Sequence, residues 1–180
     1  MAEAKIQIIP LEELAKNLAA FAIDRTDLKA LLAAIPQNSG LNTTTIEYEL
    51  QILKILSVGW SIAFYMPPDD KHKGPLAEQF WINIRDIAQK ISTLTATTSG
   101  TQIDYFEVIK DRLNTYLKVM KNLPKTVENP AGAMGPAFAV ACNHAGDAIT
   151  VLTGTKMFAL TLGAVQEYLN AVQIDDIKLN

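Results

Sequence analysis

The sequence contains few of the residue types from which a function can be recognised directly. It has one cysteine, Cys142, and two histidines, His72 and His144. A single cysteine excludes an internal disulfide framework and is typical of a reducing compartment. Two histidines are too few for a dimetal site in a helical bundle, which uses two Glu-x-x-His motifs. We therefore expect no metal and no cofactor.

A large net charge and long apolar runs are also lacking. The formal net charge is −3, which gives no general attraction to nucleic acid or to an anionic membrane surface. A membrane span needs about 20 consecutive apolar residues. The run ILSVGWSIAFYMPP is too short, and the apolar stretch at 131–154 contains Pro136, His144 and Asp147. With no apolar N-terminal segment of signal length, we expect a soluble, cytoplasmic protein that binds neither nucleic acid nor membrane.

Apolar residues recur at helical spacing almost throughout the chain, which predicts an all-α fold. We expect a single domain, residues 1–180, folded as a compact bundle of about six mostly antiparallel helices, because the predicted connections are short. The N-terminal helices are expected at about 10–35, the core at about 43–123, and a charge-poor C-terminal pair at about 136–172. No strands are expected, since no sustained two-residue alternation is bounded by turns.

The first helical segment leaves two alternatives open. Its apolar seam is interrupted by Arg25. Either one long helix carries a charge at its seam, or the chain breaks near Arg25 and a second helix begins with Asp24 or Thr26 as its cap.

Two later segments predict helices of different character. A helix is expected at about 43–66, where Thr44 and Glu47 have the spacing of a capping box. Its second half is apolar nearly all round, which is typical of a central helix. The last pair is expected at 136–152 and 155–172, joined by the sequence TGT.

His144 and Asp147 are the first candidates for chemistry. Three positions apart on a helix, they would share a face and could bind a metal or act as an acid and base pair. The structural interpretation is a polar pair that is satisfied by each other or by the backbone. We favour this second interpretation, and so predict no catalytic residue.

Cys142 also has two interpretations. It could be a nucleophile or a redox thiol. However, a helix through this region would place five residues on one buried stripe: Phe138, Cys142, Ala145, Ile149 and Leu152. Because free cysteine commonly behaves as a small core residue, we expect Cys142 in the core.

A group of aromatic residues gives a candidate ligand pocket. The aromatic residues lie at the end of the second predicted helix and the start of the third, which an antiparallel arrangement brings together. They could form the wall of an apolar pocket in which serine and tyrosine hydroxyls make polar contacts. The candidate residues are Ser57, Trp60, Ser61, Phe64, Tyr65, Phe80 and Trp81.

The scarcity of charge near the C-terminus is the main clue to function. Between residues 129 and 174 the only formal charges are Asp147, Lys156 and Glu167. These are too few to cover an ordinary solvated face, so this pair is either buried centrally or contacts a second subunit. We predict a non-catalytic interaction protein, a homodimer with Ala164 and Ala171 at the interface. The alternative is a ligand-binding or enzymatic bundle that uses the aromatic group and His144 with Asp147.

Overall fold

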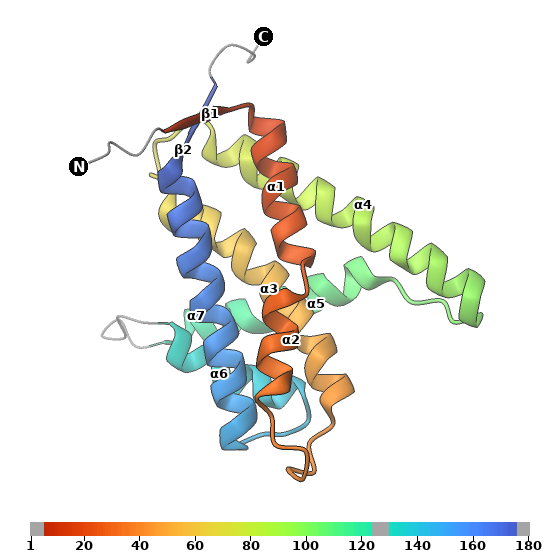
Figure 1. Ribbon diagram of the computed structural model, residues 1–180. Helices are drawn as coiled ribbons and strands as arrows, with labels where there is room; N and C mark the ends of the chain where they lie inside the picture. The colour runs from red at the N-terminus through yellow and green to blue at the C-terminus, as the bar shows by residue number, and fades with distance from the viewer. Residues whose placement is uncertain (1–5, 124–129, 176–180) are drawn as a thin grey trace. The chain divides into compact units, whose positions relative to one another are not determined.

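The computed structural model describes residues 6–123 and 130–175, and these residues are mainly helical (Figure 1). The described residues form seven helices and two short strands. They are β1 (Gln7–Ile9), α1 (Leu11–Ile23), α2 (Thr26–Ala33), α3 (Thr43–Tyr65), α4 (Lys73–Ser99), α5 (Tyr105–Lys121), α6 (Ala131–Ala141), α7 (Ala148–Ala171) and β2 (Val172–Ile174). The predicted all-α helical bundle is confirmed.

The expectation of no strands is wrong in one detail. Strands β1 and β2 pair in parallel, with Ile8 opposite Gln173, and the amide of Asp175 donates to the carbonyl of Ile9 at 2.9 Å. Each strand has three residues. Such a short strand shows no recognisable alternation, so its pairing depends on tertiary structure that brings the two ends of the described chain together.

The chain is divided into two compact units. One consists of Met1–Ala22, Val58–Phe106 and Leu162–Asn180, and the other of Ile23–Ser57 and Glu107–Thr161. Helices α3 and α7 each contribute residues to both units. The single-domain organisation stays a prediction.

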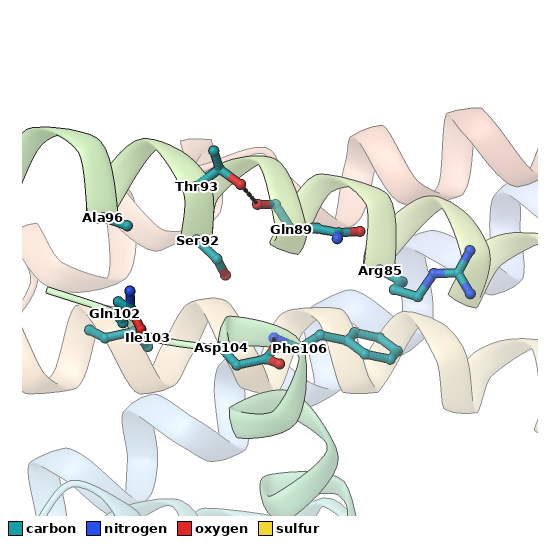
Figure 2. A pocket seen from close by; sticks show the side chains of 9 residues that line it. All are labelled: Arg85, Gln89, Ser92, Thr93, Ala96, Gln102, Ile103, Asp104 and Phe106. Carbon is teal, nitrogen blue, oxygen red and sulfur yellow. Dashed lines mark hydrogen bonds between the residues drawn. The ribbon is translucent and has the colours of Figure 1, made fainter.

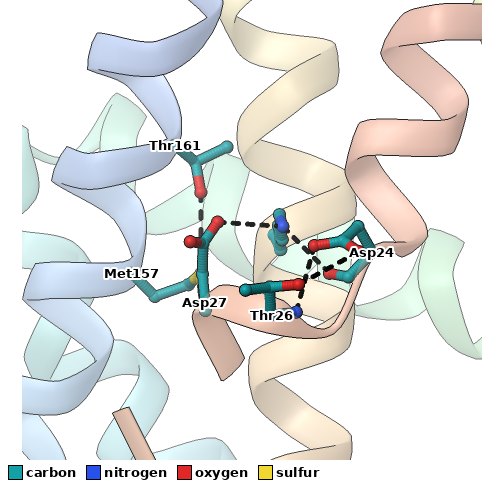
Figure 3. Close-up of polar contacts among 6 residues, drawn as sticks. Asp24, Thr26, Asp27, Met157 and Thr161 are labelled. Carbon is teal, nitrogen blue, oxygen red and sulfur yellow. Dashed lines mark hydrogen bonds and ion pairs between the residues drawn. The ribbon is translucent and has the colours of Figure 1, made fainter. Parts of the chain in front are cut away.

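The first segment breaks beside Arg25, as one of the two alternatives predicts. Helix α1 ends at Ile23 and α2 begins at Thr26, where the carboxylate of Asp24 accepts a hydrogen bond from the backbone amide at 3.0 Å (Figure 3). The ammonium of Lys54 is fully buried and binds the chain on both sides of the break. It donates to the carbonyl of Asp24 at 2.9 Å and to the carboxylate of Asp27 at 3.1 Å. The carbonyl freed by the break therefore has a partner.

Helix α3 is buried nearly all round in its second half, as predicted. Every residue from Ile52 to Ile62 is buried. A helix with no exposed face along eleven consecutive residues belongs to the core. Its side chains should therefore carry a large share of the stability.

Truncation of two leucines of α3 tests how much this helix contributes to the stability of the fold. Leu50 and Leu53 have no exposed surface. Leu50→Ala or Leu53→Ala is expected to lower the free energy of unfolding by about 2–5 kcal/mol, because each leaves a cavity. Urea denaturation measures this loss, and a loss below about 0.5 kcal/mol at both positions would show that α3 is not in the core.

The predicted boundary between the last two helices is wrong. The turn lies at residues 142–147, where Asn143 and Gly146 have positive φ of 59° and 78°, and the TGT sequence lies inside α7. Gly154 does not break the helix because its missing side chain makes room for Phe138: a Cβ there would lie 2.5 Å from the Cδ1 atom of the ring. Packing between α6 and α7 therefore outweighs the weak helix propensity of glycine.

A second glycine marks the close approach of α6 and α7. A Cβ at Gly135 would lie 2.5 Å from the carbonyl oxygen of Val151, whereas a Cβ at Gly132 would meet no atom within 4 Å. Gly135→Ala is expected to cost about 1–3 kcal/mol, because the backbone of α7 must move. Gly132→Ala, on the same helix, should cost little or nothing. Thermal denaturation of both variants checks this, and equal stability would contradict the close packing.

Candidate functional site

Helix α7 is one unbroken helix, and its start is well defined. The carboxylate of Asp147 accepts hydrogen bonds from the backbone amide of Thr150 at 2.7 Å and from the hydroxyl of Thr150 at 2.8 Å. These two hydrogen bonds lower the pKa of Asp147, and His144 adds a smaller electrostatic contribution in the same direction. Asp147 is thus the N-terminal cap of α7.

His144 and Asp147 do not share a helical face, contrary to the sequence-based expectation. Both lie in the turn between α6 and α7. The Nε2 atom of His144 accepts a hydrogen bond from the backbone amide of Asn42 at 3.2 Å. Each of the two side chains therefore binds backbone, the histidine before α3 and the aspartate at the start of α7.

The capping carboxylate of Asp147 predicts how the stability of the fold depends on pH. The pKa of Asp147 is lowered below its ordinary value of 3.8, so the ionised carboxylate stabilises the fold above that value. This contribution is lost as the pH falls through the lowered pKa. Asp147→Asn keeps a capping side chain that does not titrate. Between about pH 5 and about pH 2, the wild type should lose more stability than Asp147→Asn in thermal melts; identical pH profiles would contradict the assignment.

Two sides of α7 differ sharply. One side is buried and includes Met157, Phe158 and Val165. The opposite side is exposed and yet largely apolar, with Leu152 52% exposed and Leu160 56% exposed. Its exposed small residues are Ala148, Ala159, Ala164 and Ala171. Ala164 and Ala171 are therefore on the outer side, where the helical spacing predicts them.

Charge is nearly absent from this exposed side. Lys156 and Glu167 are exposed and carry the only formal charges of α7. Of the described residues, only those of α7 form a helix that is long and apolar enough to cross a membrane, and 39% of its most apolar window is buried inside the protein. The outer side of α7 is the candidate functional surface, and we call it the α7 face.

The predicted aromatic pocket is mostly packed side chains. Ser57 and Ser61 are fully buried, Trp60 and Phe80 are buried, and Phe64 is 49% exposed. Further along, the Phe80 and Trp81 rings meet edge to face, with centroids 5.1 Å apart. Gly59 of α3 allows Trp81 to pack closely, since a Cβ there would lie 2.5 Å from the Cζ2 atom of Trp81.

Tyr65 is the one member of the aromatic group found among the residues that line a described cavity. This cavity of about 630 Å³ lies between the α3–α4 turn, Leu14 of α1 and the end of α7 with β2. Asp70 and His72 also line it, and the Nδ1 atom of His72 lies 3.1 Å from the carboxylate of Asp70. Sequence analysis missed this histidine and aspartate pair, because the polar turn around it resembles an ordinary solvated loop.

A second hollow lies along α4 and has both polar and apolar walls. Its volume is about 640 Å³, and Figure 2 shows Arg85, Gln89 and Ser92 on α4 facing the segment that contains Asp104. The Ser92 hydroxyl accepts a hydrogen bond from the amide of Tyr105 at 3.1 Å, which ties the start of α5 to α4. No residue of this hollow was a sequence-based candidate.

Glu49 and Cys142 are two further buried groups that could carry chemistry. Arg112 of α5 binds both carboxylate oxygens of Glu49 of α3, at 2.8 and 2.6 Å, and these hydrogen bonds raise the pKa of Arg112. Cys142 is buried, as predicted, and burial raises the pKa of its thiol to about 12. At neutral pH Cys142 is therefore a thiol, which is a weak nucleophile.

The buried stripe expected around Cys142 is only half correct. Phe138 is buried with it, but Ala145 and Leu152 are exposed, because the chain turns after α6. In the parts of the chain that the structure describes, no group of three His, Cys, Asp or Glu side chains is placed to hold a metal ion.

Comparison with known proteins gives no relative. No protein-family model, curated protein or solved structure matches this chain. The α7 face and the cavities are therefore the features of the molecule that bear on its function.

Proposed function

We propose that this protein is a non-catalytic helical-bundle interaction protein that forms a homodimer through the α7 face. The observation that carries the proposal is the exposed side of α7, where Leu152 and Leu160 are more than half exposed and only Lys156 and Glu167 are charged. An apolar surface of this kind is stabilised when it is removed from water. A second copy is the commonest partner for such a surface.

A second copy suits the α7 face better than a membrane does. Lys156 lies eight residues after the first residue of α7, well inside the helix, and Glu167 lies four residues before its end. A charge in the hydrocarbon core costs at least about 2.5 kcal/mol. At an interface between two copies, the same two charges can pair with each other. The buried free thiol of Cys142 supports the cytoplasmic location predicted from the sequence.

The experiment is a measurement of mass in solution. Light scattering coupled to size-exclusion chromatography, over a wide range of protein concentrations, should give twice the chain mass of 19.7 kDa. A folded protein that stays monomeric at the highest concentration contradicts the proposal. So does a monomer that floats with lipid vesicles, since the α7 face would then contact a membrane.

One observation favours a second candidate function, the binding of a small molecule. The cavity lined by Tyr65 has apolar walls from Leu14 and Leu169 and polar groups from His72 and Asp70. A cavity of about 630 Å³ is of the size that holds small ligands. Native mass spectrometry of the purified protein tests this: a bound compound lost in Tyr65→Ala supports it, and bare chain mass opposes it.

A further inference from the structure

The α7 face has a symmetric pattern along the helix. Six residues follow one another along its centre: Leu152, Lys156, Leu160, Gly163, Glu167 and Ala171. They are separated by four, four, three, four and four positions, so the spacing is the same in either direction from the midpoint between Thr161 and Leu162. Because α7 is one unbroken helix, these spacings place all six residues on one side.

We propose that two copies of the chain pack their α7 helices antiparallel, around a two-fold axis at this midpoint. The inference rests on the proposed function, and it adds the orientation and register of the pair. In a two-fold interface, residue i contacts residue j and j contacts i. Lys156 then lies opposite Glu167 of the partner subunit, and Leu160 lies opposite Gly163 of the partner subunit.

The charges favour this orientation over the parallel one. In the antiparallel register each Lys156 meets a Glu167 of the partner subunit, twice in the dimer. A parallel pair in register would place lysine beside lysine and glutamate beside glutamate. Like charges at an interface oppose association, and opposite charges select the partner and its register.

The shape of the face favours the same register. Leu160 is 56% exposed, and a Cβ placed on Gly163 would meet no atom within 4 Å. Glycine inside a helix is less favourable than alanine, yet none of the described residues needs this position to be small. In the dimer, the leucine side chain of one copy fills the space above Gly163 of the partner subunit. At the ends of the face, Leu152 pairs with the small Ala171 of the partner subunit.

Introduced cysteine pairs distinguish antiparallel from parallel packing of the two α7 helices. Each helical residue rises about 1.5 Å, so Lys156 and Glu167 of one helix are about 16 Å apart and cannot form a disulfide with each other. In the antiparallel dimer, position 156 faces position 167 of the second copy, and the two positions 156 are also about 16 Å apart. The double variant Lys156→Cys with Glu167→Cys should therefore form a covalent dimer on mild oxidation. Each single variant should not.

The outcomes separate the register from the proposed function. Efficient cross-linking of a single variant, or none in the double variant while light scattering still shows a dimer, overturns the antiparallel register alone. A monomeric wild type overturns both proposals. Cys142 does not confuse the result, because it is buried and present in all variants.

Charge reversal gives an independent test in the reduced protein. Lys156→Glu and Glu167→Lys should each weaken dimerisation about tenfold or more, and the two together should restore it, since the pairs are remade in reverse. Lys90→Glu, at an exposed lysine of α4, is the matched control and should have no effect. Additive losses in the double variant, with helicity retained by circular dichroism, overturn the pairing of Lys156 with Glu167.

Discussion

Ala164→Glu combined with Ala171→Lys is expected to convert the dimer to a monomer while the helices stay folded. Both alanines are exposed, whereas Phe158 and Val165 are buried. Ala164 lies at the edge of the exposed side, where it also lines a hollow with Leu18 and Phe21 of α1. An unpaired charge buried at an interface costs several kcal/mol, which raises the dissociation constant by at least about 100-fold. Light scattering measures the mass, and circular dichroism with a thermal melt measures the fold.

A charge at an exposed alanine of another helix is the control for this double variant. Ala20 of α1 is exposed, and Ala20→Glu should leave both mass and melting temperature nearly unchanged. If the α7 variant remains a dimer of unchanged affinity, the interface lies elsewhere. If it unfolds, separate Ala164→Glu and Ala171→Lys variants show which position is needed for the fold.

Arg112→Met is expected to give the second large effect, a loss of about 3–5 kcal/mol in the free energy of unfolding. The carboxylate of Glu49 has a side-chain exposure of 3% and is held by two hydrogen bonds from the guanidinium. Removing the guanidinium leaves a buried charge with no opposite charge beside it. The methionine keeps most of the apolar stem, so the loss reports the charge rather than a cavity.

Replacing both partners provides the control for the ion pair. A buried ion pair exchanged for apolar side chains of similar volume is often neutral in stability, whereas a broken pair is not. Arg112→Met with Glu49→Leu should therefore recover most of the loss in urea denaturation at neutral pH. A single variant that loses less than about 1 kcal/mol would show that the pair is not needed. A double variant that recovers nothing would show that the loss does not come from an unpaired charge.

Much of the helical structure could be predicted from local spacing. The apolar periodicity predicted the helices and the nearly complete burial of the second half of α3, and every residue from Ile52 to Ile62 is buried. It also predicted that Ala164 and Ala171 point away from the core side of α7. The break beside Arg25 was one of two alternatives. The predicted cap, Asp24 or Thr26, was wrong, because Arg25 is the N-cap of α2 and makes no side-chain cap hydrogen bond, while Asp24 accepts from the amide of Thr26. These features depend on residues within a few positions of one another, so the sequence contains the information.

The candidate site could be predicted only in part. Its composition, with Lys156 and Glu167 as the last charges of a long apolar stretch, was evident from the sequence. Its extent was not, because the boundary before α7 was misplaced. The sequence predicted a helix boundary at Gly154, but this glycine lies inside α7 and the Phe138 ring packs against it. The charges inside the apolar second helix, Glu49 and Lys54, were the available signal for buried ion pairs that sequence analysis missed.

What the sequence by itself determined is therefore the helical class and the two-sided character of α7. Only the tertiary structure decided where α6 ends, which glycines allow close packing, and that Arg112 reaches Glu49, 63 positions away in the chain. The tertiary structure also decided that β1 pairs in parallel with β2, and that His72 and Asp70 line the same cavity as Tyr65. The physical reason is range: helical periodicity is set by neighbours three or four positions apart. Packing, ion pairs and cavities depend instead on contacts between distant segments, and these can outweigh local propensity.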